Sequence, residues 1–270
     1  MPELPEVETI ARGLAKLVTG DVIESIWLGR KKEPLKSPAK VIARALENAR
    51  VHRVRRVGKQ IVFDLLDPAG GRSQWVVHLG MTGQMLVCPP DRELKKHTHA
   101  IAKLASGREL RFVDPRRFGR LSIAMDDDFT GTGLEPLEVD RETFIRLFRG
   151  RQTPIKSALL NQKLLGGVGN IYADEALFRA GIRPRRRAAS LTREQLKKLN
   201  SSLRKVLNEA ICLGGSSISD YVNAAGEEGF FQMRHRVYGR VGEACMVCKT
   251  PIKRVVIAGR SSHYCPRCQK

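Results

Sequence analysis

The chain has 270 residues, of which 42% are hydrophobic, and its 48 Lys and Arg outnumber its 28 Asp and Glu to give a net charge of +20. This length exceeds the ~100–200 residues of a typical domain, so we expect two domains or more. No run approaches the ~18 apolar residues of a membrane span and no signal peptide leads the sequence. From these features we expect a soluble, cytoplasmic protein.

The positive charge predicts a polyanionic partner, because cationic side chains displace the counterions that surround phosphates. Nucleic acid is the simplest such partner. An anionic membrane surface would also suit the charge, but no basic amphipathic segment stands out in the sequence.

The first residues carry a candidate nucleophile. A start methionine before a residue as small as Pro2 is normally removed, which leaves a secondary α-amino group. An α-amino group titrates near ~7.7–8.0, so a sizeable fraction is unprotonated at neutral pH. It can form an iminium with an aldehyde-like carbon, and Glu3, Glu6 and Glu8 supply nearby acid or base groups. The alternative is that these glutamates only begin a helix.

The N-terminal half is predicted to be mostly strands. Apolar residues at 7, 10, 14 and 17 first indicate a helix that ends at Gly20. A further helix is predicted at 38–48, and alternating runs predict strands at 22–28, 51–57, 61–66, 75–79, 85–87, 100–104, 109–113 and 121–125. Short strands at this spacing favour a sandwich of two mainly antiparallel sheets. Residues 126–128 and 131–136 predict an acidic, glycine-containing linker.

The C-terminal half has helical periodicity. Helices are predicted at 141–148, 154–162 and 171–180, and a longer one begins at the capping box Thr192–Gln195 and reaches Gly214. Residues 216–232 have no clear period and predict a loop. The glycine-rich turn at 166–170 either binds phosphate or only makes a tight helix–helix turn.

Two loops between predicted strands hold candidate nucleic-acid contacts. One of them, at 114–119, holds Arg116 and Phe118, where an arginine could pair with bases and a ring could enter a base stack. The alternative is a surface turn with Phe118 in the core. Met81 follows the strand at 75–79, and its local sequence favours a buried side chain. Lys59 begins a strand after several arginines, so it faces either phosphate or solvent.

Four of the six cysteines form two C-x2-C pairs, at Cys245 and Cys248 and at Cys265 and Cys268. This spacing is typical of a zinc ribbon, and four thiolates close the tetrahedron of a structural metal. One structural Zn²⁺ is therefore predicted, and a zinc hydrolase is disfavoured. Cys88 and Cys212 lie in apolar surroundings and are expected to be buried.

Five motifs occur in a fixed order: PELPEVE at 2–8, HLGM at 78–81, DPRRFG at 114–119, GVGNIYA at 167–173 and the four cysteines. In this order they span nearly the whole chain, which closely resembles the bacterial formamidopyrimidine-DNA glycosylases, a base-repair family that excises 8-oxoguanine.

The resemblance implies an α+β, multi-domain chain. A catalytic antiparallel β-sandwich with flanking helices would occupy 1–130, and a linker with the first helix 131–150. A helix-two-turns-helix DNA-binding domain would occupy 151–235, with the loop at 216–232 covering the lesion, and a four-cysteine zinc finger 236–270. DNA would lie in the cleft between the two halves.

The resemblance also implies roles for single residues. Pro2 would be the nucleophile, Glu3 its acid/base partner and Glu6 a support, while Lys59 would contact a phosphate near the lesion. Met81, Arg116 and Phe118 would fill the gap left by the everted nucleotide. The DNA backbone would be held by His97, Lys156, Asn170 and Arg260.

The function implied is a bifunctional glycosylase and abasic-site lyase that excises oxidised purines (8-oxoguanine and formamidopyrimidines) from damaged double-stranded DNA, with β,δ-elimination. The resemblance implies a bacterial protein that is associated with the nucleoid through DNA. Nothing in the sequence suggests an assembly larger than a monomer. Two alternatives stay open. The first is an endonuclease VIII-like enzyme for oxidised pyrimidines, although Leu4 favours the enzyme for purine lesions. The second is a non-catalytic DNA- or RNA-binding protein on the same scaffold.

Overall fold

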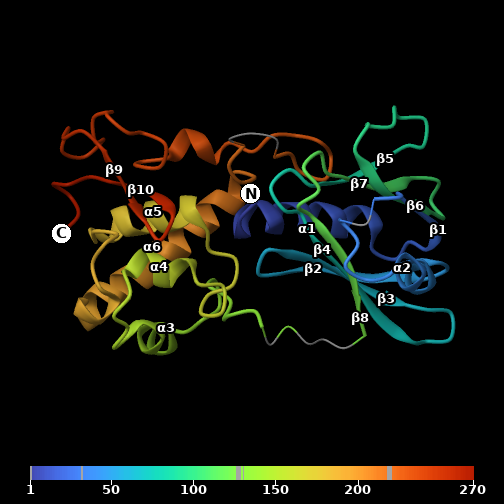
Figure 1. Ribbon diagram of the computed structural model, residues 1–270, viewed down its shortest axis with the longest axis horizontal. Coiled ribbons are helices and arrows are strands. Elements are labelled where there is room, and N and C mark those ends of the chain that lie inside the picture. Colours follow the sequence, from blue (N-terminus) through green and yellow to red (C-terminus); the bar gives the residue numbers. More distant parts are fainter. Residues whose placement is uncertain (1, 32, 126–128, 130, 218–220) are drawn as a thin grey trace. The chain divides into compact units, whose positions relative to one another are not determined.

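The computed structural model describes residues 2–31, 33–125, 129, 131–217 and 221–270. The chain divides into two compact units (Figure 1). The first comprises Met1–Phe129 with Gly214–Phe230, and the second comprises Thr130–Leu213 with Phe231–Lys270. Antiparallel sheets fill the first unit, helices and a small hairpin fill the second, and the α+β fold class is confirmed. Within the described residues, no helix is both long and apolar enough to cross a membrane.

The first unit contains two four-stranded antiparallel sheets, with strand orders β1-β6-β7-β5 and β2-β3-β4-β8. All eight predicted strands are confirmed with small shifts at their ends: β1 (Ile23–Leu28), β2 (Arg50–Val57), β3 (Gln60–Leu66), β4 (Arg72–His78), β5 (Gln84–Cys88), β6 (Thr98–Leu104), β7 (Glu109–Val113) and β8 (Arg120–Ala124).

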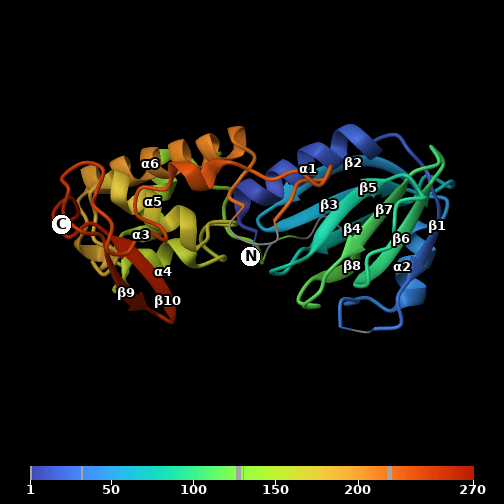
Figure 2. The ribbon, with the colours of Figure 1, turned by 90° about the horizontal axis from the view of Figure 1, so that it is seen from above.

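Two helices complete the core of this unit. Helix α1 (Leu4–Val18) buries Val7, Ile10 and Leu14 and contacts β2 and β3, along which it runs in Figure 2. Helix α2 (Ala39–Leu46) contacts β1, β4 and β8. The core includes the fully buried rings of Phe63 and Trp75, whose centroids lie 5.0 Å apart.

The second unit is built around two long helices that pack side by side, α5 (Asn170–Ala180) and α6 (Arg193–Cys212). The predicted apolar stripe of α6 is confirmed, and the Thr192–Gln195 capping box opens the helix. The smaller elements are α3 (Arg141–Phe148), α4 (Ile155–Leu160), η1 (Ala188–Ser190), η2 (Phe231–Arg234), and the hairpin strands β9 (Lys253–Ile257) and β10 (Arg260–Tyr264). No sequence pattern predicts the two strands of the hairpin.

Two features differ from expectation. The sequence groups 216–232 with the helical domain, whereas residues 214–230 pack with the first unit, where Tyr221 and Ala224 join the core around α1. The prediction of a buried Cys212 is wrong: the residue is exposed because it lies off the face of α6 that holds Val206 and Ala210. The predicted linker at 126–128 and part of the predicted loop, 218–220, lie outside the described residues.

Candidate functional site

The predicted nucleophile and its two acidic partners lie together at the start of α1. Glu3 occupies the N-cap position, and its backbone N–H donates to Glu6 Oε2 at 2.8 Å in a capping box. Pro5 lies in the first turn, where its missing N–H costs the helix nothing. Pro2, Glu3 and Glu6 are all buried. The helix start therefore fixes one carboxylate directly beside the backbone that follows Pro2.

Glu6 also holds the loop at 214–230. Its Oε1 accepts the backbone N–H of Ser216 at 2.8 Å, and a Cβ on Gly215, whose φ is +84°, would lie 2.9 Å from the Glu6 side chain. The Tyr221 hydroxyl donates to the Gly214 carbonyl at 2.9 Å. Burial raises the pKa of Tyr221, and the charge of Glu6 raises it further. One carboxylate thus links the start of α1 to the loop.

Lys59 lies in the turn between β2 and β3, directly after Gly58, whose φ is +57°. Its neighbour Gln60 pairs with His78 across the sheet. Burial lowers the pKa of His78, and the nearby charges of Arg120 and Lys59 lower it further. A neutral imidazole beside two cations gives this end of the sheet a positive field that suits a phosphate.

The three residues predicted to fill the gap in the duplex, called the wedge residues below, are Met81, Arg116 and Phe118, and all three are exposed. Met81 is 41% and Phe118 54% exposed, so the interpretation of either side chain as a core residue is wrong. The Arg116 guanidinium lies 4.8 Å from the centroid of the Phe118 ring, in a cation–π contact. Exposed His97 is close to the same loop, since its carbonyl accepts the backbone N–H of Asp114 at 2.9 Å. The structure brings these predicted DNA contacts to one end of the sandwich.

In the second unit, the glycine-rich turn leads directly into α5. Gly169 is the N-cap, so Asn170 is the first helical residue and not the cap. Gln162 fixes the turn by donating to the Val168 carbonyl at 2.8 Å and accepting from Gly167 at 2.9 Å. Among the described residues, the buried Asn170 Oδ1 has no hydrogen-bond partner. The turn therefore ends at the N-terminus of an eleven-residue helix, where the helix dipole favours negative charge.

Lys156 is fully buried, which its predicted contact with DNA does not anticipate. Its ammonium group lies 2.6 Å from Asp174 Oδ1 and donates to the Ser261 carbonyl at 2.7 Å. The other Asp174 oxygen accepts the backbone N–H of His263 at 2.8 Å and lies 3.0 Å from its Nδ1. Asp174 therefore fastens the β9–β10 hairpin to α4 and α5.

Arg260 lies exposed at the tip of that hairpin. Ala258 and Gly259 both have positive φ, and Ile257 pairs with Arg260, which defines a two-residue type I′ turn. Asp174 and its neighbour Glu175 are the two carboxylates in the stretch 171–177 of α5, and such a pair among apolar residues is the sequence signal that could have pointed to Asp174.

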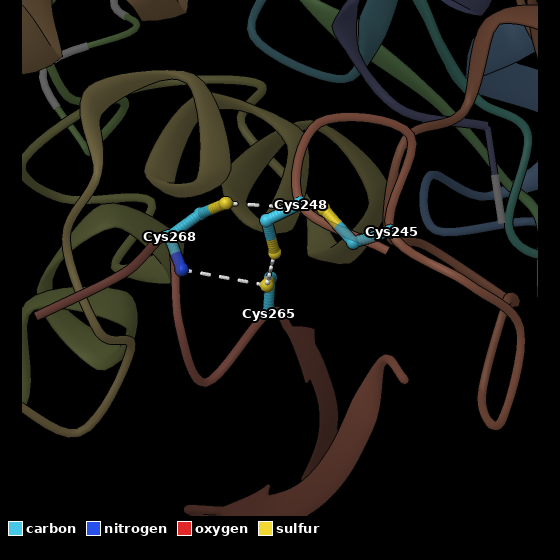
Figure 3. A group of neighbouring side chains, drawn as sticks. All are labelled: Cys245, Cys248, Cys265 and Cys268. Carbon is cyan, nitrogen blue, oxygen red and sulfur yellow. Dashed lines mark hydrogen bonds between the residues drawn. The ribbon is translucent and has the colours of Figure 1, made fainter. Parts of the chain in front are cut away.

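The four predicted metal ligands come together. All four sulfur atoms lie within 4.8 Å of one another, with Cys245 to Cys268 at 3.9 Å and Cys248 to Cys265 at 3.4 Å. Figure 3 shows these side chains converging from two turns. A tetrahedral zinc with bonds of about 2.3 Å separates its sulfurs by about 3.8 Å, so the residues fit the ion. Four thiolates leave no position for a reacting water, and the site is a structural one.

Comparisons with known proteins cover the whole chain. Family models match residues 1–121 as a formamidopyrimidine-DNA glycosylase N-terminal domain, 132–222 as the H2TH domain of the same enzymes, and 242–270 as a zinc finger found in FPG and IleRS. Among curated proteins, the chain is 46% identical to the formamidopyrimidine-DNA glycosylase of Solibacter usitatus and 42% identical to that of Thioalkalivibrio sulfidiphilus, each over 100% of both chains.

Solved structures agree with these relatives. The MutM (FPG) protein of Thermus thermophilus has a TM-score of 0.87 at 43% identity, with 99% of this chain and 98% of that chain covered. A Lactococcus lactis FPG mutant in complex with a Fapy-dG containing DNA has a TM-score of 0.91 at 33% identity over 100% of both chains. Sequence, domain order and fold thus give one answer: the chain belongs to the formamidopyrimidine-DNA glycosylase family.

Proposed function

We propose that this chain is a bifunctional DNA glycosylase and abasic-site lyase that excises oxidised purines from duplex DNA in the bacterial cytoplasm, at the nucleoid. The observation that carries the proposal is the start of α1, where Pro2 directly precedes Glu3, whose backbone is hydrogen-bonded to Glu6. The family and the net charge of +20 agree with it. Removal of Met1 is part of the proposal, because the Pro2 nitrogen must be a free amine.

The proposed chemistry begins with an everted nucleotide, since its sugar cannot be reached inside the stack and eversion costs a few kcal/mol. The Pro2 nitrogen attacks C1′ with its lone pair, the damaged base leaves with the electrons of the glycosidic bond, and the proton that the nitrogen then loses neutralises the departing base. Glu3 protonates the sugar ring oxygen as the ring opens, which gives an iminium at C1′. The iminium acidifies the adjacent carbon, so β-elimination expels the 3′ phosphate and δ-elimination then expels the 5′ phosphate.

The other predicted contacts divide by unit. In the first unit, Lys59 would bind a phosphate near the lesion. Met81, Arg116 and Phe118 would fill the gap left by the everted nucleotide, and His97 would hold the DNA backbone. In the second, Asn170 and Arg260 would hold the backbone. Lys156 can touch DNA only if its ammonium group leaves Asp174, so its burial favours a supporting role for it. Zinc would be held by the four cysteines and would keep this hairpin folded.

The experiment that tests this function measures single-turnover excision from a duplex with one 8-oxoguanine. Pro2→Gly and Glu3→Gln should each remove most base excision while leaving DNA affinity largely intact. Pro5→Ala is the matched control, because it changes the other proline of the motif and leaves the amine and both carboxylates in place. Unchanged turnover in either test variant would reject the role assigned to that residue.

A further inference from the structure

The three candidate wedge residues come from two loops that run side by side. Met81 belongs to the loop between β4 and β5, whereas Arg116 and Phe118 belong to the loop between β7 and β8. Each loop crosses from one sheet to the other. Their flanking strands are neighbours at both ends, since His78 pairs with Arg120 in one sheet and Gln84 pairs with Val113 in the other. The topology therefore forces the two loops together.

A buried carboxylate joins the loops. Asp114 has no exposed surface, and its Oδ1 accepts the hydroxyl of Thr82 at 2.6 Å. Its Oδ2 accepts the backbone N–H of Gly119 at 2.7 Å, at the far end of its own loop. The backbone N–H of Arg116 lies 3.3 Å from both Asp114 Oδ1 and Thr82 Oγ1. Hydrogen bonds to an ionised acceptor are the stronger kind, so this contact outweighs an ordinary turn bond.

The backbones of the loops are also in direct contact. Gly80 has a φ of +65°, and a Cβ there would lie 2.6 Å from Gly119 N and from Phe118 C. Arg117 has a φ of +58°, a conformation that a non-glycine residue adopts at a cost and keeps only where its surroundings impose it. Between these fixed points, Met81 and Phe118 project with about half of their surface exposed. The two apolar wedge residues are therefore exposed, although the backbone of their loops is held in place.

We infer that Thr82 and Asp114 are positioning residues that hold Met81, Arg116 and Phe118 ready to enter the base stack. This inference rests on the proposed function. A side chain that enters the stack must offset the unstacking of a base step, and a wedge ordered in advance avoids losing conformational freedom at that moment. Loosening the brace formed by Thr82 and Asp114 should therefore slow eversion of a stacked base and spare the later chemistry at Pro2.

Thr82→Val is the sharpest variant, because it removes the hydroxyl at nearly constant volume, whereas replacing fully buried Asp114 would risk unfolding the unit. Single-turnover rates are compared on two duplexes, one with 8-oxoguanine and one with an abasic site, which has no base to unstack. Loss of a bond to a charged acceptor should slow the 8-oxoguanine reaction about tenfold. The abasic reaction should stay close to the wild-type rate, and Thr82→Ser should restore both.

A double-mutant cycle identifies the route of the effect. If Thr82 acts through the wedge, Thr82→Val added to Phe118→Ala should slow the 8-oxoguanine reaction no further than Phe118→Ala alone. Equal slowing of both duplexes, no slowing of either, or additive losses in the cycle would overturn the inference while leaving the proposed function intact. A wild-type protein that processes neither duplex would instead reject the proposed function, and the inference with it.

Discussion

Glu6 and Ser216 lie 210 residues apart in the chain, yet the Ser216 backbone N–H donates to Glu6 Oε1 at 2.8 Å. The second oxygen of the same carboxylate accepts the backbone N–H of Glu3. A shift of the loop at 214–230 would therefore be felt at the residue proposed as acid/base, because both share one rigid acceptor. Under the proposed function, the contact offers a physical route by which a lesion bound at the loop would align the proposed nucleophile, Pro2.

Glu6→Gln should uncouple the loop from the helix start. A carboxamide has one acceptor oxygen where the carboxylate has two, so one of the two buried backbone N–H groups would face the amide NH₂. Leaving that donor without an acceptor should lower the free energy of unfolding by about 1–3 kcal/mol. We expect faster hydrogen exchange across the described part of 214–230 and slower base excision, with the sandwich still folded. Hydrogen-exchange mass spectrometry and single-turnover kinetics measure the two effects.

Glu8→Gln is the matched control on the same helix. Burial alone would raise the pKa of Glu8, but Arg12 and Arg56 together hold it below its ordinary value, and neither partner belongs to the loop. Its replacement should leave exchange in the loop unchanged. Equal loop exchange in the Glu6 and Glu8 variants would contradict the coupling.

Asp174→Asn should loosen the β9–β10 hairpin. The substitution leaves the fully buried Lys156 ammonium group without its counter-ion, and breaking a buried ion pair costs about 3–5 kcal/mol. We expect rapid exchange in the hairpin and weaker DNA binding, because Arg260 loses its support. Glu142→Gln breaks an exposed pair with Arg193 in the same unit and should cost less than about 1 kcal/mol. If both variants lose the same stability, Asp174 does not hold the hairpin.

Loss of zinc should unfold the finger and weaken DNA binding. Structural zinc contributes about 10–16 kcal/mol to folding in small finger peptides, so this segment depends on the metal. Cys265→Ser, or a chelator, should abolish bound zinc and reduce affinity, whereas exposed Cys212 lies outside the cluster and Cys212→Ser should change neither. Zinc content and affinity for duplex DNA are measured together. Normal affinity in a Cys265→Ser protein without zinc would argue against this role.

The first unit should lose stability in mild acid because of His78. Its folded pKa is lowered by burial and by the charges of Arg120 and Lys59, so the unfolded chain binds more protons below an ordinary pKa of about 6.5. Stability should fall as the pH drops from about 6.5 towards the folded pKa. Both tryptophans, Trp27 and Trp75, lie in this unit, so their fluorescence during urea unfolding reports on it.

His78→Gln should flatten this pH dependence, since the variant has no group to titrate there. His52→Gln is the control, because His52 is exposed on β2 and should leave the wild-type slope unchanged. A slope that survives in His78→Gln would show that another group is responsible.

The sequence predicts elements well where local periodicity carries the information. Alternation locates the strands, the spacing of Leu196, Leu199 and Leu203 locates α6, and the cysteine spacing locates the metal site. The β9–β10 hairpin has no such signal, because Lys253 and Arg254 open its first strand and its turn places Ala258 where a glycine or asparagine is usual.

The polar contacts that hold the site lie beyond local patterns. Thr82 bonds Asp114 across 32 residues, and His263 meets Asp174 across 89. Each depends on how strands and helices pack, which periodicity does not encode. Exposed Met81 and Phe118 break the rule that large apolar residues are buried, and the rigid backbone beneath them keeps them exposed.

The most direct test of the central claim is borohydride trapping on a duplex with one 8-oxoguanine, followed by peptide mapping of protein shown by mass to begin at Pro2. The account predicts a covalent adduct at the Pro2 nitrogen, which would establish lesion, nucleophile and lyase chemistry together. An adduct formed only with a thymine-glycol duplex would contradict the purine preference. Absence of an adduct at Pro2 on either duplex would contradict the catalytic account itself.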